Sequence, residues 1–150
     1  MASGAAPPET AKDGAGEGDE MKTVKVVAAI IRLDGCVLAT QRGHGEQAGG
    51  WEFPGGKVEP GETPEAAVVR EIDEELATAI VVERLVTRVI HDYGSFVLDM
   101  DCFLCTLDGG EPTLLEHRAA RWLDAAHLDD VAWLPADVKV VAAIRAQSII

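Results

Sequence analysis

The sequence has few basic residues and no long hydrophobic run. Only 13 Lys and Arg stand against 26 Asp and Glu, which gives a net charge of −13. This balance excludes binding to duplex nucleic acid or to an anionic membrane through bulk electrostatics. The longest apolar run, residues 26–31, is far shorter than the roughly 20 residues that cross a bilayer. We therefore expect neither duplex nucleic acid nor a membrane as a partner.

The first 20 residues contain no aromatic residue and no Ile, Leu or Val. A stretch rich in Gly, Ala, Pro and acidic residues buries too little apolar surface to offset the entropy lost on ordering. We expect residues 1–20 to form a disordered arm and residues 21–150 to form one domain. The arm has no basic start followed by an apolar run, so it is not a signal peptide, and we expect a cytoplasmic protein.

The three cysteines form an odd set, which argues for reduced thiols rather than a disulfide framework. Cys102 and Cys105 make a C-x-x-C pair, a spacing that is also found in zinc and redox sites. They lie in residues 96–107, which read as a strand, where side chains three apart point to opposite faces and cannot hold one ion. We expect buried structural cysteines.

Turn signals and β-branched residues predict strands on both sides of one central helix. Asp34-Gly35 is a strong hairpin signal. The strands expected from such runs cover residues 24–33, 36–42, 51–53, 80–90, 96–107 and 118–123. A final helix is expected over residues 137–146, with Asp137 as a candidate N-cap. This order predicts an α/β (α+β) layered domain in which a mixed β-sheet is sandwiched between helices.

Residues 63–76 give the clearest helix signal. Thr63 is a suitable N-cap, and Pro64 suits the first helical position. Val69, Ile72 and Leu76 lie three and four residues apart, which predicts one apolar stripe that faces the core.

The same helix carries a cluster of acidic side chains. Glu71, Glu74 and Glu75 are spaced i, i+3 and i+4, so they share one side of the helix. No Lys or Arg lies three or four residues C-terminal to any of them. Taken alone, the pattern fits a solvated acidic face and a site for a hard cation such as Mg²⁺ equally well. The Gly-Gly loop before the helix favours the cation site, because glycine lets backbone approach a ligand closely.

Residues 56–75 resemble the Nudix box, in which Gly, Glu and an Arg-Glu-aliphatic-x-Glu-Glu run stand at fixed offsets. The matching residues are Gly56, Glu62, Arg70, Glu71, Ile72, Glu74 and Glu75. Seven specified positions rarely coincide by chance. The chain is thus similar to the Nudix hydrolases of the MutT-like type. The resemblance implies the Nudix fold and hydrolysis of a nucleoside triphosphate to the monophosphate and pyrophosphate.

The resemblance also implies a Mg²⁺ site, with Mn²⁺ as a possible substitute. The ligands that it implies are the Gly55 carbonyl and the carboxylates of Glu71, Glu74, Glu75 and Glu116. Arg70 would orient the glutamates of the box, Glu71 would be the general base, and Glu62 is the second candidate for that role. Bound cations bridge carboxylates to phosphate oxygens, which explains how so acidic a chain holds a triphosphate.

Two positions depart from the box. Ala77 and Thr78 stand where the box has glycine and then an aliphatic residue. If that glycine ends the helix in the left-handed region, alanine there costs on the order of 1 kcal/mol; otherwise the helix ends differently.

Beyond the box, the chain is most similar to CTP pyrophosphohydrolases, with the 8-oxo-dGTP-cleaving, MutT-like enzymes close behind. The residues that resemble substrate contacts are Arg42, Glu52, Lys57 and Asp137. An ionised Asp137 would accept a hydrogen bond from the amine of cytosine, whereas a protonated one would imitate an amide. We expect cleavage of a CTP- or dCTP-type or modified nucleotide. An 8-oxo-dGTP diphosphatase that cleans the nucleotide pool, in the service of DNA repair, is the alternative.

Other interpretations remain open at this point. A nucleotide sugar or dinucleotide is a different substrate within the family, and a catalytically silent nucleotide-binding module is a different class of protein. The intact set of acids argues against the silent module. His44, His91, His117 and His127 share no spacing, and we assign them no metal. Both a monomer and a homodimer fit the sequence.

Overall fold

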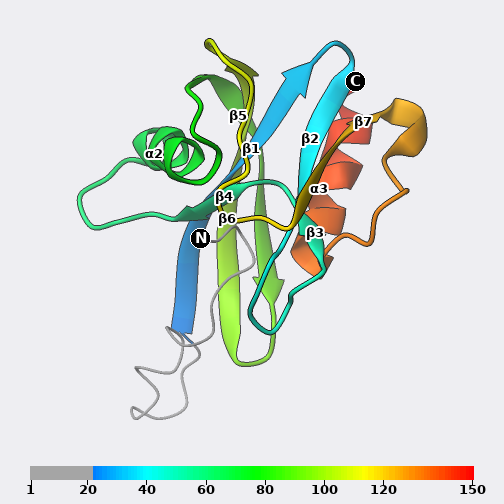
Figure 1. Ribbon diagram of the computed structural model, residues 1–150. Helices are drawn as coiled ribbons and strands as arrows, with labels where there is room; N and C mark the ends of the chain where they lie inside the picture. Colours follow the sequence, from blue (N-terminus) through cyan, green and yellow to red (C-terminus); the bar gives the residue numbers. More distant parts are fainter. Residues whose placement is uncertain (1–21) are drawn as a thin grey trace.

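The computed structural model describes residues 22–150 (Figure 1). The expected disordered arm at residues 1–20 lies outside the described residues. Among the helices that the structure describes, none is long and apolar enough to cross a membrane.

A seven-stranded mixed sheet forms the centre of the fold. The strands are β1 (Lys22–Leu33), β2 (Cys36–Gln41), β3 (Trp51–Glu52), β4 (Gly55–Lys57), β5 (Ile80–Asp92), β6 (Phe96–Leu107) and β7 (Ala119–Asp124). Their order is β3-β2-β1-β6-β5, with β4 paired to β1 and β7 paired to β2. The central pair, β1 and β6, is parallel from Lys22↔Phe96 to Ile31↔Cys105, and the other pairs between named strands are antiparallel. The mixed sheet that we expected is thus confirmed, and most strand ends differ from the expected ones by at most two residues.

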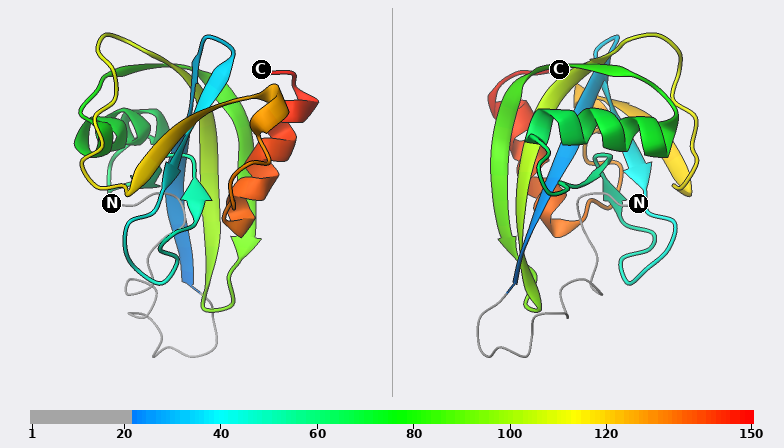
Figure 2. Two further views of the ribbon diagram at one scale, coloured as in Figure 1. Left: turned by 45° about the vertical axis from the view of Figure 1, so that its right-hand side comes forward. Right: turned by 90° about the vertical axis from the view of Figure 1, so that its left-hand side faces the viewer.

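Two α-helices, α2 (Pro64–Leu76) and α3 (Pro135–Ala146), lie on opposite sides of the sheet (Figures 1 and 2). Alternate residues of β1 face the two layers: Ala28 and Ile30 belong to the core under α3, while Ala29 and Ile31 belong to the core under α2. A short 3-10 turn, η2 (Ala125–His127), follows β7. The sheet therefore buries both of its faces, which explains the nearly continuous apolar run at residues 26–31.

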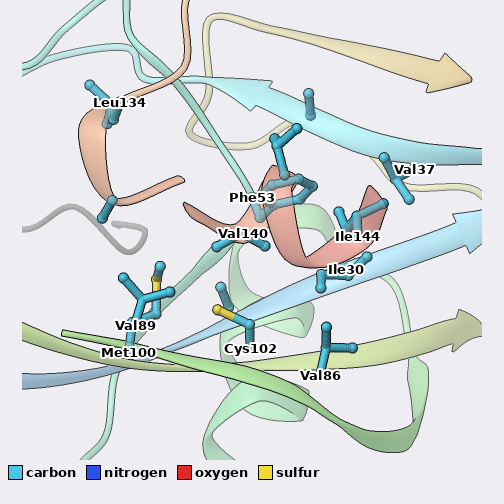
Figure 3. Close-up of a cluster of buried hydrophobic side chains, with 14 of the residues drawn as sticks. Ile30, Val37, Phe53, Val86, Val89, Met100, Cys102, Leu134, Val140 and Ile144 are labelled. Carbon is cyan, nitrogen blue, oxygen red and sulfur yellow. The ribbon is translucent and has the colours of Figure 1, made fainter. Parts of the chain in front are cut away.

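The larger core lies between the sheet and α3 (Figure 3). Cys102 is buried in this core beside Met100 and Val140, whereas Cys105 is buried in the opposite core, under α2. All three thiols are free. The expectation that the C-x-x-C pair points to opposite faces is confirmed, and burial raises the pKa of the Cys105 thiol to about 12.

Helix α2 begins as its sequence predicts, and its end decides between the two alternatives that the sequence left open. The Thr63 hydroxyl accepts a hydrogen bond from the Ala66 N–H at 3.1 Å, and Pro64 occupies the first turn. Ala77 ends the helix with φ 51° and ψ 42°, and its N–H donates to the Asp73 carbonyl. The chain thus keeps a left-handed terminator without a glycine, which costs about 1 kcal/mol relative to glycine.

The buried face of α2 differs from the expected stripe. Val69 is 39% exposed, so its placement on the core face was wrong, and Val68 takes that position. The helix turns 100° per residue, so the face that contains Val68 and Ile72 also contains Glu71 and Glu75. Two carboxylates of the box are therefore carried into the protein on the apolar side of the helix.

Helix α3 corrects a second expectation. It begins at Pro135 with Leu134 as the N-cap, so the assignment of Asp137 to the cap was wrong. Asp137 lies in the first turn with its side chain fully buried, and its Oδ1 accepts a hydrogen bond from the Phe53 N–H at 3.0 Å. Pro135 suits the first helical position because it has no N–H to satisfy, and this places the helix start two residues earlier.

Candidate active site

The two glycines of β4 allow two close approaches. A Cβ at Gly55 would overlap the carbonyl oxygen of Val27 on β1. A Cβ at Gly56 would overlap the Glu71 carboxylate and would lie 2.6 Å from its Oε2. The first glycine thus lets β4 pack against β1, and the second makes room for a carboxylate between β4 and α2.

Arg70 gathers the acids of the box. Its Nε and Nη2 donate to the two carboxylate oxygens of Glu62 at 2.6 and 3.0 Å, and Nη2 also donates to the Lys57 carbonyl at 2.9 Å. Its Nη1 donates to Glu71 Oε2 at 3.0 Å and to Glu74 Oε1 at 3.2 Å. One guanidinium thus joins β4, the following loop and α2, an arrangement that its rigid planar fork favours.

Glu62 is an anchor for Arg70. Its Oε1 also accepts a hydrogen bond from the Glu59 N–H at 2.9 Å. The hydrogen bonds from Arg70, and then the one from Glu59, hold the pKa of Glu62 below its ordinary value. A carboxylate with both oxygens engaged and a lowered pKa is a poor proton acceptor, which favours Glu71 over Glu62 as the general base.

Glu71 and Glu75 form a buried acidic pair. Glu75 is fully buried and Glu71 is nearly so, and the two carboxyls interact electrostatically. Burial raises the pKa of both, and it raises the pKa of Glu75 to about 10, with a smaller contribution from Glu71. Glu74 differs, because its side chain is 55% exposed at the rim. The three glutamates are thus neighbours, two inside the protein and one at its surface.

The donor set suits a hard divalent cation. Within residues 22–150, no three His, Cys, Asp or Glu side chains form a ready-made group of metal ligands. The chemistry of the acidic pair nevertheless fits such an ion, because burial raises the pKa of both carboxyls and so favours a bound proton that a cation can replace. All the donors are oxygens, as Mg²⁺ and Mn²⁺ prefer.

A late loop brings Glu116 to the end of α2. The N–H of Thr113 donates to the Leu76 carbonyl at 2.7 Å, and the N–H of Leu115 donates to the Glu75 carbonyl at 3.2 Å. These are carbonyls of the last helical turn, which have no partner inside the helix. Glu116 is exposed and lies one residue beyond this attachment, so the loop carries it to the same end of α2 as Glu75.

His117 is a residue of the site that sequence reasoning missed. Its side chain is only 4% exposed, and its Nε2 lies 3.6 Å from Glu75 Oε1. Burial lowers the pKa of His117 to about 4, so the imidazole is neutral at physiological pH. The one signal in the sequence was its place next to Glu116. That signal is weak, because His117 has no second histidine at a spacing typical of a shared site.

A second buried group of charges lies between β2, β3 and α3. Arg42 donates through Nη1 to Glu52 Oε1 at 3.2 Å, and Glu52 is fully buried. Burial, and then the charge of Glu52, raise the pKa of Asp137 well above its ordinary value. Glu52 also contributes to the raised pKa of Glu75, so the two groups of charges influence each other.

The structure thus brings together three of the four residues expected to contact substrate, namely Arg42, Glu52 and Asp137. Lys57 contributes its carbonyl to Arg70, and the expected role of its side chain stays a prediction. Trp133 stacks on Phe53 with ring centroids 4.6 Å apart, and Phe53 is a buried residue of the larger core. The metal-ligand roles of Gly55, Glu71, Glu74, Glu75 and Glu116 also stay predictions.

Comparison with known proteins identifies the family. A model of the NUDIX domain matches residues 26–143. The CTP pyrophosphohydrolase of Escherichia coli is 35% identical over 127 residues, which cover 84% of this chain and 94% of that protein. The 8-oxo-dGTP diphosphatase of Haemophilus influenzae is 35% identical over 124 residues, which cover 81% and 91%. The crystal structure of a MutT NUDIX hydrolase from Burkholderia pseudomallei superposes with a TM-score of 0.73 at 30% identity, covering 82% of this chain and 98% of that one.

Proposed function

The chain belongs to the NUDIX domain family and is a hydrolase of the MutT-like type, and we propose that it cleaves a nucleoside triphosphate into the monophosphate and pyrophosphate with Mg²⁺. The observation that carries the proposal is the Arg70 network, which holds Glu62, Glu71 and Glu74 next to the buried carboxyl of Glu75. The guanidinium of Arg70 alone does not neutralise these four acids, so their repulsion is tolerable when divalent ions bind among them. The bound ions then present positive charge to the phosphates of the substrate.

Each residue of the box has a distinct part in the proposed reaction. A bound Mg²⁺ would polarise a phosphoryl oxygen and stabilise the charge of the leaving phosphate. Glu74 and Glu75, with Glu116 and the Gly55 carbonyl, would hold the ion. Water attacks an internal phosphorus, the anhydride P–O bond breaks, and Glu71 accepts the proton of the water.

Arg70 keeps Glu71 in place for this proton transfer. Its Nε, Nη1 and Nη2 all donate to groups of the protein, Glu71 and Glu62 among them, so the guanidinium acts on the acids of the box rather than on substrate. Glu62 anchors the guanidinium from the loop side. Positioning of this kind supports the rate by holding the base within reach of the water.

Buried charges support recognition of the nucleoside. Asp137 Oδ1 accepts from Phe53, while its Oδ2 has no hydrogen-bond partner among residues 22–150. Burial raises the pKa of this carboxyl and so favours its protonated form, and a protonated carboxyl can both donate and accept, as an amide does. This property favours the oxidised guanine over the cytosine candidate, and such a substrate implies cleaning of the cytoplasmic nucleotide pool.

Pyrophosphate release from a panel of nucleotides with Mg²⁺ tests the function. The panel holds CTP, dCTP, dGTP, 8-oxo-dGTP and a nucleotide sugar. We expect turnover of triphosphates that stops when Mg²⁺ is chelated. Glu74→Gln should lower kcat by at least about 100-fold, since a ligand should matter more than the 10–100-fold of its supporting partners. Asp73→Asn, which removes an exposed acid of the same helix, is the matched control and should keep full activity.

Two outcomes of the panel would overturn the proposal. Cleavage of the nucleotide sugar alone would place the protein in another substrate class. Nucleotide binding without turnover of any substrate would make it a silent binding module.

Asp137→Asn tests the base preference. Because asparagine keeps a donor and an acceptor, we expect kcat/KM for 8-oxo-dGTP to stay within about threefold, which is less than 1 kcal/mol. The wild type should lose 8-oxo-dGTP activity at high pH, where Asp137 ionises, and the variant should not. The measurement is kcat/KM against pH for 8-oxo-dGTP and for CTP, in the wild type and in the variant. If Asp137→Asn lowers kcat/KM equally for every nucleotide, Asp137 has a purely structural role.

A further inference from the structure

The segment that carries Glu116 is attached to the protein at both ends. On one side, Thr113 and Leu115 donate to the last carbonyls of α2. On the other side, the Arg118 N–H donates to the Gln41 carbonyl at 2.9 Å, at the end of β2 where β7 begins. Residues 116 and 117 therefore connect two attachment points. One is α2, which carries ligands of the proposed metal site, and the other is β2, which carries none of them.

His117 fills the inner side of this span. Its Nε2 lies 3.6 Å from Glu75 Oε1, and its Nδ1 has no hydrogen-bond partner among residues 22–150. A buried polar atom without a partner costs stability, and an apolar side chain would cover the end of the helix at less cost. The presence of an imidazole at this position therefore calls for a reason beyond packing.

Gly43 lies close to the backbone of the same span. A Cβ there would lie 3.0 Å from the Glu116 carbonyl oxygen, 3.6 Å from the Arg118 nitrogen and 3.9 Å from the His117 carbonyl carbon. Its φ lies outside the left-handed region, so the backbone does not need glycine at this position. What needs glycine here is the close approach of residues 116–118.

We propose that His117 and Gly43 form a positioning clamp that sets the distance between Glu116 and Glu75, so that both carboxylates reach the same divalent ion. The inference rests on the proposed function. His117 acts through its contact with Glu75, and Gly43 acts by letting the backbone of Glu116 come close. Both are positioning residues, because neither is placed in contact with substrate.

Binding of Mn²⁺ alone tests the clamp. The dissociation constant is measured by electron paramagnetic resonance titration of the nucleotide-free full chain, with thermal melts in parallel. His117→Leu should weaken Mn²⁺ binding by about 10-fold, the range for residues that orient metal ligands. His117→Gln, which keeps a polar group near Glu75, should recover most of the affinity, whereas a role in packing alone predicts no such rescue.

Gly43→Ala tests the clamp from its other side. The added methyl must displace the Glu116 backbone by a few tenths of an ångström, so we expect weaker Mn²⁺ binding with an unchanged melting temperature. Gly110→Ala is the matched control, because a Cβ there meets no atom within 4 Å, and it should bind Mn²⁺ as the wild type does. If His117→Leu fails to fold, Gly43→Ala decides the question.

A double-mutant cycle of His117→Leu with Glu116→Gln tests whether His117 affects Mn²⁺ affinity through Glu116. If the clamp acts through Glu116, the loss in the double variant should be smaller than the product of the two single losses. Unchanged Mn²⁺ affinity in both His117→Leu and Gly43→Ala, in a wild type that binds Mn²⁺ and cleaves nucleotides, would overturn the clamp alone. A wild type that does neither would overturn the proposed function, and the clamp with it.

Discussion

Gly56→Ala should remove most of the nucleotide hydrolysis while leaving the protein folded. The added Cβ would overlap the Glu71 carboxylate, which is the far end of a flexible side chain and can move aside at little cost to the backbone. The proposed base would then be displaced by about 1 Å, and a displacement of this size costs on the order of 100-fold in rate. The measurement is kcat/KM with Mg²⁺, together with circular dichroism and a thermal melt.

The neighbouring glycine provides the contrast. A Cβ at Gly55 would overlap the Val27 carbonyl of β1, and backbone in the middle of a sheet cannot move aside. We therefore expect Gly55→Ala to unfold or aggregate rather than to yield a folded, inactive enzyme. Activity close to that of the wild type in folded Gly56→Ala would contradict the placement of Glu71 as the base.

The stability of the metal-free protein should fall as the pH rises from about 7 to about 9. Glu75 has a folded pKa of about 10 and a reference value of 4.5, so between these values the folded state holds a proton that the unfolded state releases. Where the unfolded state binds fewer protons, stability falls with rising pH, by at most about 1.4 kcal/mol per pH unit for one group. Urea unfolding in the presence of a chelator measures this slope.

Mg²⁺ should reverse the trend, because the cation replaces the proton and binds better as the carboxyl ionises. The stabilisation by Mg²⁺ should thus be larger at about pH 9 than at about pH 7. The His117 contribution does not interfere, since its folded pKa of about 4 and its reference value of 6.5 both lie below this window. Glu75→Gln should reduce the slope and abolish the Mg²⁺ effect, and the slope that remains belongs to Asp137, whose pKa burial also raises. An unchanged slope together with an unchanged Mg²⁺ effect in this variant would contradict the role of Glu75.

Much of the fold was accessible from local signals. The hairpin at Asp34-Gly35 was predicted because the turn needs two residues at positive φ, and the structure has them at 52° and 76°. Helix α2 was predicted from Thr63 and Pro64, whose partners lie within one turn. The parallel pairing of β1 with β6 was not predicted as such, because it joins residues 74 positions apart and no local rule selects that partner.

The candidate site was likewise predictable from the sequence only in part. The spacing of Glu71, Glu74 and Glu75 implied a shared side of the helix, but it did not show that two of them are buried and one is exposed. That difference depends on how α2 rotates against the sheet, and the error at Val69 has the same origin. The contact of Glu75 with His117 depends on a loop that follows two long strands.

By itself, the sequence determined the family, the central helix with its caps, and the acidic character of the site, because these depend on residue types at short, fixed offsets. Only the tertiary structure decided that Arg70 joins β4, the following loop and α2 at one point. It likewise decided that Asp137 bonds to Phe53 across 84 residues of chain and that Glu75 lies beside His117. The physical reason is that burial, and with it the raised pKa of a carboxyl, is a property of everything packed around the group, which no stretch of neighbouring residues specifies.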